Sequence, residues 1–407
     1  MSSLRLKPSN FSRLWFAQSV SEFGNWMGAI PLVAILVLDA SPAQMGLLET
    51  ARALPAVLIG LYAGVWVDRL PRKPLLIGAD LGRFVLLMLA VVLLISGALA
   101  MSGLYAIVFL VGALTVLFDI AYRSYLPTLV VSEELLQSNS KLSASASVAE
   151  VASPGIGGAL VQMVSATFAL LVDALTFLLS ALSLFTIRLQ EPTRATDRNG
   201  GVIAEIAYGV RFVWGTRELR ALAVALSAQF FFGGFFATLY ALYVLKVIGL
   251  GPIMLGLLIG AGGVGALVGA AIVNPLTRRF GIGRVMVGAL IFGIPLATLV
   301  PLAALVDETE ALVLLFTNQL VGDIAFAIFL ISQMSVRQAL TPDHLLGRMN
   351  ASFEFVVGGI GILGMLTGGL LGQFVGMVPA LSVAVAGFTI PCLWLALSPV
   401  RALRSID

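Results

Sequence analysis

Charged residues are scarce in this chain. Only 11% of its 407 residues are Asp, Glu, Lys or Arg, compared with about 25% in a typical soluble domain. Hydrophobic residues make up 59%, and the mean hydropathy is +1.03. This composition excludes an ordinary soluble domain and predicts a protein that lies in the lipid bilayer.

Cysteine and histidine occur once each, as Cys392 and His344. A single cysteine excludes a disulfide within the chain and cannot support a metal cluster, so we expect no metal and no cofactor. The net charge of +3 does not indicate a nucleic acid partner, because basic residues of membrane proteins mainly set orientation. The Gly-x-x-x-x-Gly-Lys-[Ser/Thr] nucleotide loop is also absent, so we expect a protein that is not an enzyme.

Long apolar runs recur along the whole sequence. Each has about 20 residues, the length at which a helix crosses ~30 Å of hydrocarbon. The short alternating segments typical of a transmembrane β-barrel are missing. The predicted fold class is therefore an all-α polytopic membrane protein with twelve transmembrane helices. The expected spans are residues 14–38, 43–67, 75–99, 104–129, 143–164, 167–188, 219–245, 253–277, 284–304, 310–336, 351–375 and 379–398.

The longest polar stretch divides these spans into two sets of six. We predict an N-terminal six-helix bundle at residues 1–188, a cytoplasmic linker at 189–218 and a C-terminal six-helix bundle at 219–407. Residues 204–214 in the linker have the pattern of an amphipathic helix on the membrane surface. Lys and Arg gather in alternate loops, and the positive-inside rule then places both termini in the cytoplasm.

Short motifs recur between the two halves. Residues 118–122 (FDIAY) match residues 322–326 (GDIAF), about half the chain apart. Two parallel repeats that enclose a binding cavity near the bilayer midplane are typical of secondary transporters. The repeats therefore favour two pseudo-symmetric bundles that bind a substrate between them.

The loop between spans two and three carries the most specific motif. Gly64, Asp68, Arg69, Arg72 and Lys73 follow the pattern Gly-x-x-x-Asp-Arg-x-x-Arg-Lys. This pattern resembles the signature loop of the major facilitator superfamily, and the resemblance implies the fold of that superfamily for the whole chain. It also implies a gating loop, in which Asp68 makes a contact that holds one conformation and breaks in the other. The alternative is that the basic residues only anchor the loop.

Further motifs resemble the drug:proton antiporter branch that contains macrolide-efflux and enterobactin-exporter-like proteins. They include residues 52–55 (RALP) and Asp80-x-x-Arg83. We expect Asp80 and Arg83 to lie close to the cytoplasmic surface and to support the gating loop. Pro71 departs from the superfamily pattern, which commonly has glycine there. Proline fixes φ near −65°, so a turn that needs a positive φ must be built differently here.

The fifth span contains Ser153, Pro154, Gly157 and Gly158. They resemble the antiporter motif Gly-Pro-x-x-Gly-Gly, with serine in place of the first glycine. Proline kinks a membrane helix and glycines allow close packing, which could seal the path against proton leak. The alternative is a generic packing face.

Carboxylates inside the spans are the sharpest functional evidence, because each is costly in hydrocarbon. A buried carboxylate without a fixed cation can bind and release a proton as access alternates. Glu22 and Glu150 have no basic residue within one helical turn, so we predict that Glu22, Glu150 and Asp119 couple transport to protons.

Two of the intramembrane carboxylates have a cation one turn away on the same helix face. Glu49 precedes Arg52, and Asp119 precedes Arg123, at spacings that allow pairing. We predict intramembrane ion pairs there, which leaves Asp119 open to either a structural or a proton-coupling role.

The predicted substrate cavity involves two spans. The first has a polar face around Glu22, and the seventh is crowded with aromatic side chains. Aromatic lining favours a hydrophobic or amphipathic substrate over a sugar, although packing or lipid contact would explain these rings equally well. The expected lining residues are Gln18, Asn25, Trp26, Gln229, Phe232, Phe236 and Tyr240.

We therefore predict a secondary active transporter that exports hydrophobic or amphipathic small molecules, as multidrug efflux pumps do, by proton-coupled antiport and alternating access. Its partners would be a small-molecule substrate, protons and the lipid bilayer, without nucleic acid. We expect it to function as a monomer in the plasma (inner) membrane of a prokaryote. The alternatives are a specific metabolite or siderophore exporter, an uncoupled facilitator, and a membrane scaffold or receptor that transports nothing.

Overall fold

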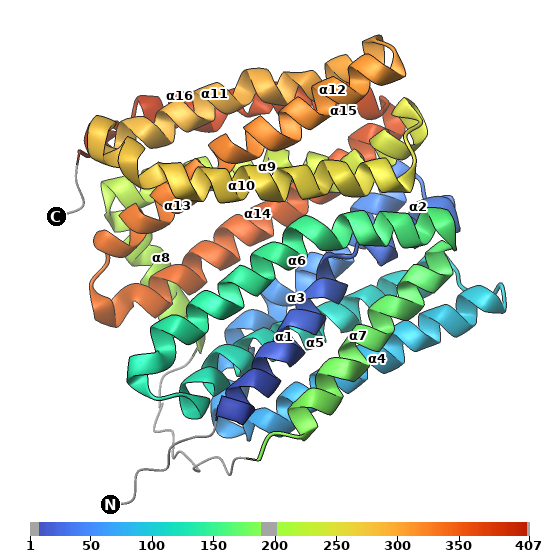
Figure 1. Ribbon diagram of the computed structural model, residues 1–407. Helices are drawn as coiled ribbons and strands as arrows, with labels where there is room; N and C mark the ends of the chain where they lie inside the picture. The colour runs from blue at the N-terminus through green and yellow to red at the C-terminus, as the bar shows by residue number, and fades with distance from the viewer. Residues whose placement is uncertain (1–7, 189–201, 405–407) are drawn as a thin grey trace, which may run out of the picture. The chain divides into compact units, whose positions relative to one another are not determined.

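The computed structural model describes residues 8–188 and 202–404, and throughout these two ranges the regular secondary structure is helical (Figure 1). Nine helical segments in them are long and apolar enough to cross a membrane. The pair α1 and α2, together with α3 and α6, completes a set that is consistent with the twelve predicted spans. The predicted all-α fold class is confirmed.

The chain forms two compact units. Unit 1 contains residues 1–39 and 51–199, and unit 2 contains residues 40–50 and 200–407. Residues 40–50 belong to unit 2 because glycines bring the first turns of α3 close to α14: a Cβ at Gly46 would lie 3.1 Å from Gly369 Cα. The predicted bundle and linker boundaries stay a prediction, and residues 189–201 of the linker lie outside the described residues.

Unit 1 is built from the first six predicted spans. Its first span is broken at Gly28, whose φ of 70° ends α1 and begins α2; glycine adopts this left-handed conformation without steric cost. The elements are α1 (Pro8–Trp26), α2 (Ala29–Leu36), most of α3 (Pro42–Arg69), α4 (Arg72–Ile95), α5 (Met101–Leu129), η1 (Ser132–Glu134), α6 (Leu135–Met163) and α7 (Ala166–Phe185).

Unit 2 contains the other six spans and an additional helix. Two of its spans contain a π-helical stretch, η2 and η4, and the last span is divided at Phe388. The elements are α8 (Val202–Gly215), α9 (Arg217–Tyr243), η2 (Val244–Ile248), α10 (Pro252–Phe280), α11 (Ile282–Leu302), η3 (Ala303–Leu305), α12 (Glu308–Thr317), η4 (Asn318–Gly322), α13 (Asp323–Ala339), η5 (Asp343–Leu345), α14 (Leu346–Phe374), α15 (Met377–Gly387), α16 (Thr389–Ala396) and η6 (Pro399–Ala402).

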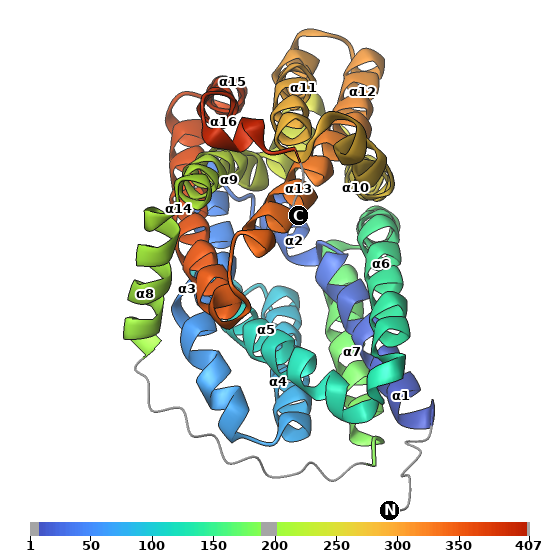
Figure 2. The same ribbon diagram turned by 90° about the vertical axis from the view of Figure 1, so that its left-hand side faces the viewer.

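The predicted amphipathic segment at residues 204–214 is a helix, α8. It lies beside α14 (Figure 2), where a Cβ at Gly209 would contact the backbone of Arg348. Glycine therefore lets the two helices approach closely. Placement of α8 on the membrane surface stays a prediction.

Helix α6 begins earlier than the predicted fifth span. Hydropathy places the start at residue 143, but the helix begins at Leu135 and includes a serine-rich turn. The hydroxyl of Ser140 donates to the Leu136 carbonyl at 2.8 Å, and that of Ser145 donates to the Lys141 carbonyl at 3.0 Å. Because these side chains bond to their own helix, a polar segment remains helical.

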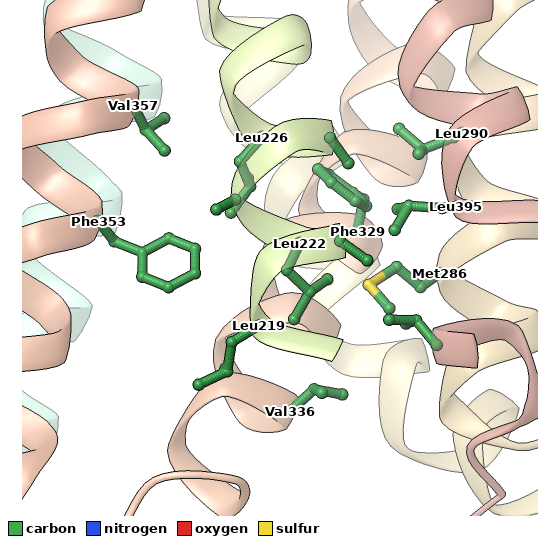
Figure 3. Packing of buried hydrophobic residues seen from close by; sticks show 14 of the residues in the cluster. Leu219, Leu222, Leu226, Met286, Leu290, Phe329, Val336, Phe353, Val357 and Leu395 are labelled. Atoms are coloured by element: carbon green, nitrogen blue, oxygen red, sulfur yellow. The ribbon is translucent and has the colours of Figure 1, made fainter. Parts of the chain in front are cut away.

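Each unit has its own apolar core. In unit 2, leucines of α9 pack against α11, α13, α14 and α16, with Phe329 fully buried among them (Figure 3). In unit 1, Phe118 and Tyr125 of α5 pack with residues of α1, α4, α6 and α7. These cores hold the helices that carry the polar residues described next.

Candidate transport site

Arg83 on α4 is a cation in the interior of unit 1. Its side chain is fully buried and forms an ion pair with Asp80, which is also fully buried and lies one turn earlier. The guanidinium carbon lies over two rings, 4.5 Å from the centroid of Phe118 and 4.3 Å from that of Phe177. Cation–π contacts with both rings stabilise a charge that has left water.

The location of Asp80 and Arg83 near the cytoplasmic surface stays a prediction, but both side chains belong to the interior of unit 1 rather than to a loop. Arg83 lies about three helical turns beyond the start of α4, and neither side chain is exposed. The spacing in sequence could not reveal this burial, because the covering rings of Phe118 and Phe177 come from α5 and α7.

The three carboxylates predicted to couple protons belong to one electrostatic network. Glu22 on α1 interacts with Asp119 on α5, Glu150 on α6 and Arg83. Glu22 Oε1 also accepts a hydrogen bond of 2.9 Å from Gln18 Nε2. Arg83 thus interacts with Glu22 and Asp119, and Glu150 is linked to them through Glu22, while the proton-coupling role of these acids stays a prediction.

In each predicted ion pair the basic residue is more exposed than the carboxylate. Arg123 is exposed, and Arg83 acts more strongly than Arg123 on the charge of Asp119. Glu49 is buried, whereas Arg52 is exposed. The cation nearest in sequence is therefore not the main electrostatic influence on Asp119.

Asp173 on α7 is a further intramembrane carboxylate of the site, to which the sequence assigned no role. It is 5% exposed, its Oδ1 has no hydrogen bond within the described part of the chain, and its charge interacts with Arg83. A Cβ at Gly24 would overlap the side chains of Asp173 and Thr176, so glycine lets α1 pack on this carboxylate. A lone Asp in an apolar run was the available signal.

The antiporter motif packs on the break in the first span. Gly157 of α6 faces the Met27 carbonyl, and a Cβ there would overlap it. Ser153, Pro154 and Gly158 are also buried, and α6 continues through the proline. The motif thus brings α6 against the backbone where α1 ends.

Unit 2 repeats this arrangement at the motif's predicted repeat partner. A Cβ at Gly364 of α14 would overlap the Phe231 carbonyl of α9, and a Cβ at Gly368 would lie 2.7 Å from Phe235 Cα. Span eleven therefore packs on span seven as span five packs on span one.

The described part of the gating loop caps a helix. Lys73 Nζ donates to the carbonyl oxygens of Phe185, at 3.1 Å, and Ile187, at 2.6 Å, at the C-terminal end of α7. Arg13 donates to the carbonyl between them, that of Thr186. Cations are favoured at this negative end of the helix dipole.

The turn around Pro71 needs no positive φ. Pro71 is the N-cap of α4 with a φ of −60°, and Arg72 follows it as a buried side chain. This is the different construction that the proline predicts. The side chains of Gly64, Asp68 and Arg69 lie outside the described residues, so their gating role stays a prediction.

The predicted cavity residues fall into two groups. Phe232 lies against Gly387, and the Phe236 ring stacks on Phe388 with centroids 5.7 Å apart, as the packing alternative expects. Asn25 and Trp26 are exposed. Three of the polar members have a buried atom without a hydrogen-bond partner in the described ranges. These atoms are Gln18 Oε1, Gln229 Oε1 and the Tyr240 hydroxyl.

The sequence was compared with models of known protein families. The model of the MFS_3 family, described as transmembrane secretion effector, matches residues 2–407. The chain belongs to this family. The resemblance of its signature loop to the major facilitator superfamily is thereby confirmed.

Curated relatives are transporters. The MFS-type transporter YfiS of Bacillus subtilis is 24% identical over 384 residues, which cover 89% of this chain and 86% of the relative. The multidrug efflux pump Tap of Mycolicibacterium fortuitum is 27% identical over 357 residues, 84% of each protein.

Solved structures share the fold at lower identity. A bacterial homologue of the iron transporter ferroportin has a TM-score of 0.76 at 17% identity, covering 97% of this chain and 99% of that one. A bacterial homologue of the lysosomal transporter Spinster has a TM-score of 0.75 at 14% identity, covering 97% of each chain. This family member is therefore a membrane transporter with the fold of the major facilitator superfamily.

Proposed function

We propose that this transporter exports hydrophobic or amphipathic small molecules by proton-coupled antiport. The observation that carries the proposal is the electrostatic network in unit 1, in which Glu22 interacts with Asp119, Glu150 and Arg83, and Asp119 also interacts with Arg83. The relationship to the Tap multidrug efflux pump supports export as the direction and drug-like compounds as the substrate class.

The network contains more carboxylates than buried cations. Asp80 already pairs with Arg83, and Arg123 beside Asp119 is exposed, so within the described residues ionised Glu22 or Asp119 adds negative charge to the interior beyond what Arg83 balances. An unpaired charge is costly there, and binding of a proton removes that cost. Loading a proton from one side of the membrane and releasing it to the other therefore biases the conformations that alternating access requires.

Membrane placement belongs to the same proposal. The protein acts in the plasma membrane of a prokaryote, both termini lie in the cytoplasm, and the monomer is the transporting unit. The asymmetry of basic residues between alternate loops supports this orientation. The loop at residues 64–73 acts as the gate on the cytoplasmic side.

Purified protein in liposomes tests coupling through Glu22→Gln. We expect wild-type substrate accumulation to follow an imposed pH gradient, and Glu22→Gln to lower it by at least about tenfold while substrate exchange without a gradient continues. The measurement is uptake of a fluorescent lipophilic compound with and without the gradient. Glu310→Gln is the matched control, because Glu310 is an exposed carboxylate at the start of α12.

The outcomes separate the alternatives. Equilibration that ignores the pH gradient in the wild type would indicate an uncoupled facilitator. Coupled flux of one metabolite or siderophore, without flux of unrelated lipophilic compounds, would indicate a specific exporter. Undiminished pH coupling in Glu22→Gln would contradict the role of that residue, and the absence of any flux would favour a scaffold or receptor.

A further inference from the structure

A π-helical stretch interrupts the tenth span of unit 2. Residues 318–322 form η4, and Asp323 follows at once as the first residue of α13. The Asn318 side-chain amide donates to the Leu296 carbonyl of α11 at 3.1 Å, which fixes the start of the stretch. Short π-helical insertions change the direction of the residues that follow and are frequent at functional sites.

Helix α10 makes room for the carboxylate after this stretch. A Cβ at Gly262 would overlap Asp323 Oδ2 and would lie 3.6 Å from Gln319 Nε2. One turn further along α10, a Cβ at Gly265 would overlap the Leu320 carbonyl. Asp323 and the Gln319 amide therefore share one side of η4 and α13, against glycine backbone rather than a side chain.

Tyr240 on α9 supplies an independent observation. Its hydroxyl is buried and has no hydrogen-bond partner in the part of the chain that the structure describes, and the phenol interacts electrostatically with Asp323. The nearby Tyr243 differs, because its hydroxyl donates to the Val300 carbonyl at 2.7 Å. A buried hydroxyl without a partner costs free energy unless a ligand or water bonds to it.

The same face of α9 borders open space. Gln229 and Gly233 precede Tyr240 at spacings of three turns and two turns, which place all three on one side of the helix. A Cβ at Gly233 would meet no atom within 4 Å, and Gln229 Oε1 is a second buried acceptor without a partner among the described residues. A bound molecule beside Gly233 would have both polar groups within its reach along this face.

We infer that Asp323, Tyr240 and Gln319 form a recognition site for a positively charged amine group of the transported compound. A carboxylate attracts the charge, amide and phenol oxygens accept its N–H groups, and the tyrosine ring attracts a cation through its face. The inference rests on the proposed export of amphipathic compounds and narrows them to amphipathic cations. It assigns substrate charge recognition to unit 2 and leaves proton coupling to unit 1.

Equilibrium binding tests this site without any gradient. The probes are a dansyl compound with a protonated dimethylammonium group, which carries one N–H, and the same compound with a neutral isopropyl group of nearly equal shape. We expect the purified wild type in detergent to bind the cationic probe about tenfold more tightly. Asp323→Asn should remove this preference with the affinity for the neutral probe within about twofold, and Tyr240→Phe should reduce the preference by about threefold.

Matched variants distinguish recognition from general damage. Glu310→Gln removes an exposed carboxylate and Tyr243→Phe removes a phenol that is already bonded, so both should keep the cation preference. Gly262→Ala should weaken it, because the new methyl displaces the Asp323 carboxylate. The milder Tyr240→Phe and Gly262→Ala variants decide the matter if Asp323→Asn does not fold.

Three results would overturn the inference. They are equal affinity of the wild type for both probes, no saturable binding of the cationic probe, and an equal loss of both affinities in Tyr240→Phe and Gly262→Ala. Failure of the proposed antiport is a different result. In that case the cation preference persists, also in Glu22→Gln, while flux in liposomes does not respond to the pH gradient.

Discussion

The fully buried Arg83 of unit 1 and the half-buried Arg337 of unit 2 are held in different ways. Arg83 pairs with the carboxylate of Asp80 and interacts with further acids. Arg337, near the end of α13, donates to two neutral amides, at 2.6 Å to Asn350 Oδ1 and at 3.4 Å to Gln333 Oε1. Each guanidinium also lies over phenylalanine, at 4.0 Å from the Phe353 centroid in the case of Arg337.

This difference separates two uses of a cation in a membrane protein. Amides keep the same charge at every physiological pH, so the hydrogen bonds of Arg337 are fixed contacts, and the carboxylate that interacts with it, Glu354, is exposed. Carboxylates can be neutralised by protons, so the surroundings of Arg83 can change when the proton concentration changes.

The largest effect is expected from removal of the arginine with carboxylate partners. Arg83→Met leaves Asp80 buried without its partner, which should lower the free energy of unfolding by about 3–5 kcal/mol. Arg337→Met leaves two neutral amides without their donor and an exposed carboxylate, Glu354, that water can solvate, so its loss should be about 1–3 kcal/mol. Thermal unfolding of the purified variants in one detergent measures both losses.

A double variant sharpens this prediction. Asp80→Asn combined with Arg83→Met removes the unpaired charge and should recover part of the stability lost in Arg83→Met. Equal losses for Arg83→Met and Arg337→Met, without recovery in the double variant, would remove the distinction between the two arginines.

Glycine packing should give a smaller and symmetric effect. Gly157→Val and Gly364→Val each insert a side chain against a backbone carbonyl, of Met27 and Phe231 respectively, and each should destabilise by about 1–3 kcal/mol or slightly more. Gly288→Val is the control, since a Cβ at Gly288 meets no atom within 4 Å. A large loss in only one of the two bundles would show that the repeats do not share this contact energetically.

The smallest effect is expected at the helix cap. Lys73→Met removes the donor to the carbonyls of Phe185 and Ile187, which should cost about 0.5–1 kcal/mol of unfolding free energy. Arg284→Met removes an exposed charge and should cost less. If Lys73→Met loses no more stability than Arg284→Met, capping by charge is not the role of this residue.

The spans could be predicted from the sequence because hydropathy depends on residues that are neighbours along the chain. The break at Gly28 could not, since one glycine in an apolar run has no signal that separates a positive φ from ordinary helix. The π-helical residues 318–322 likewise lie within a run that hydropathy reads as one continuous helix.

The sequence predicts which carboxylates belong to the candidate site, but it does not predict that Arg83 is the cation of their network. Glu22, Asp119 and Glu150 stand out as carboxylates in apolar runs, and the fold brings them together. Arg83 was assigned to the loop because its role depends on Phe118 and Phe177, which come from other helices. Partners distant in sequence decide whether an ionisable residue supports a loop or forms the centre of a network.

The attachment of α1 and α4 to the end of α7 has a consequence for work across a pH difference. Lys73 and Arg13 are held there by main-chain carbonyl oxygens, which have no proton to gain or lose at physiological pH. The joint is therefore insensitive to acid, whichever compartment it faces. A proton-driven transporter needs contacts of this kind between helices that must stay together, because the proton gradient that drives its conformational change would otherwise weaken them.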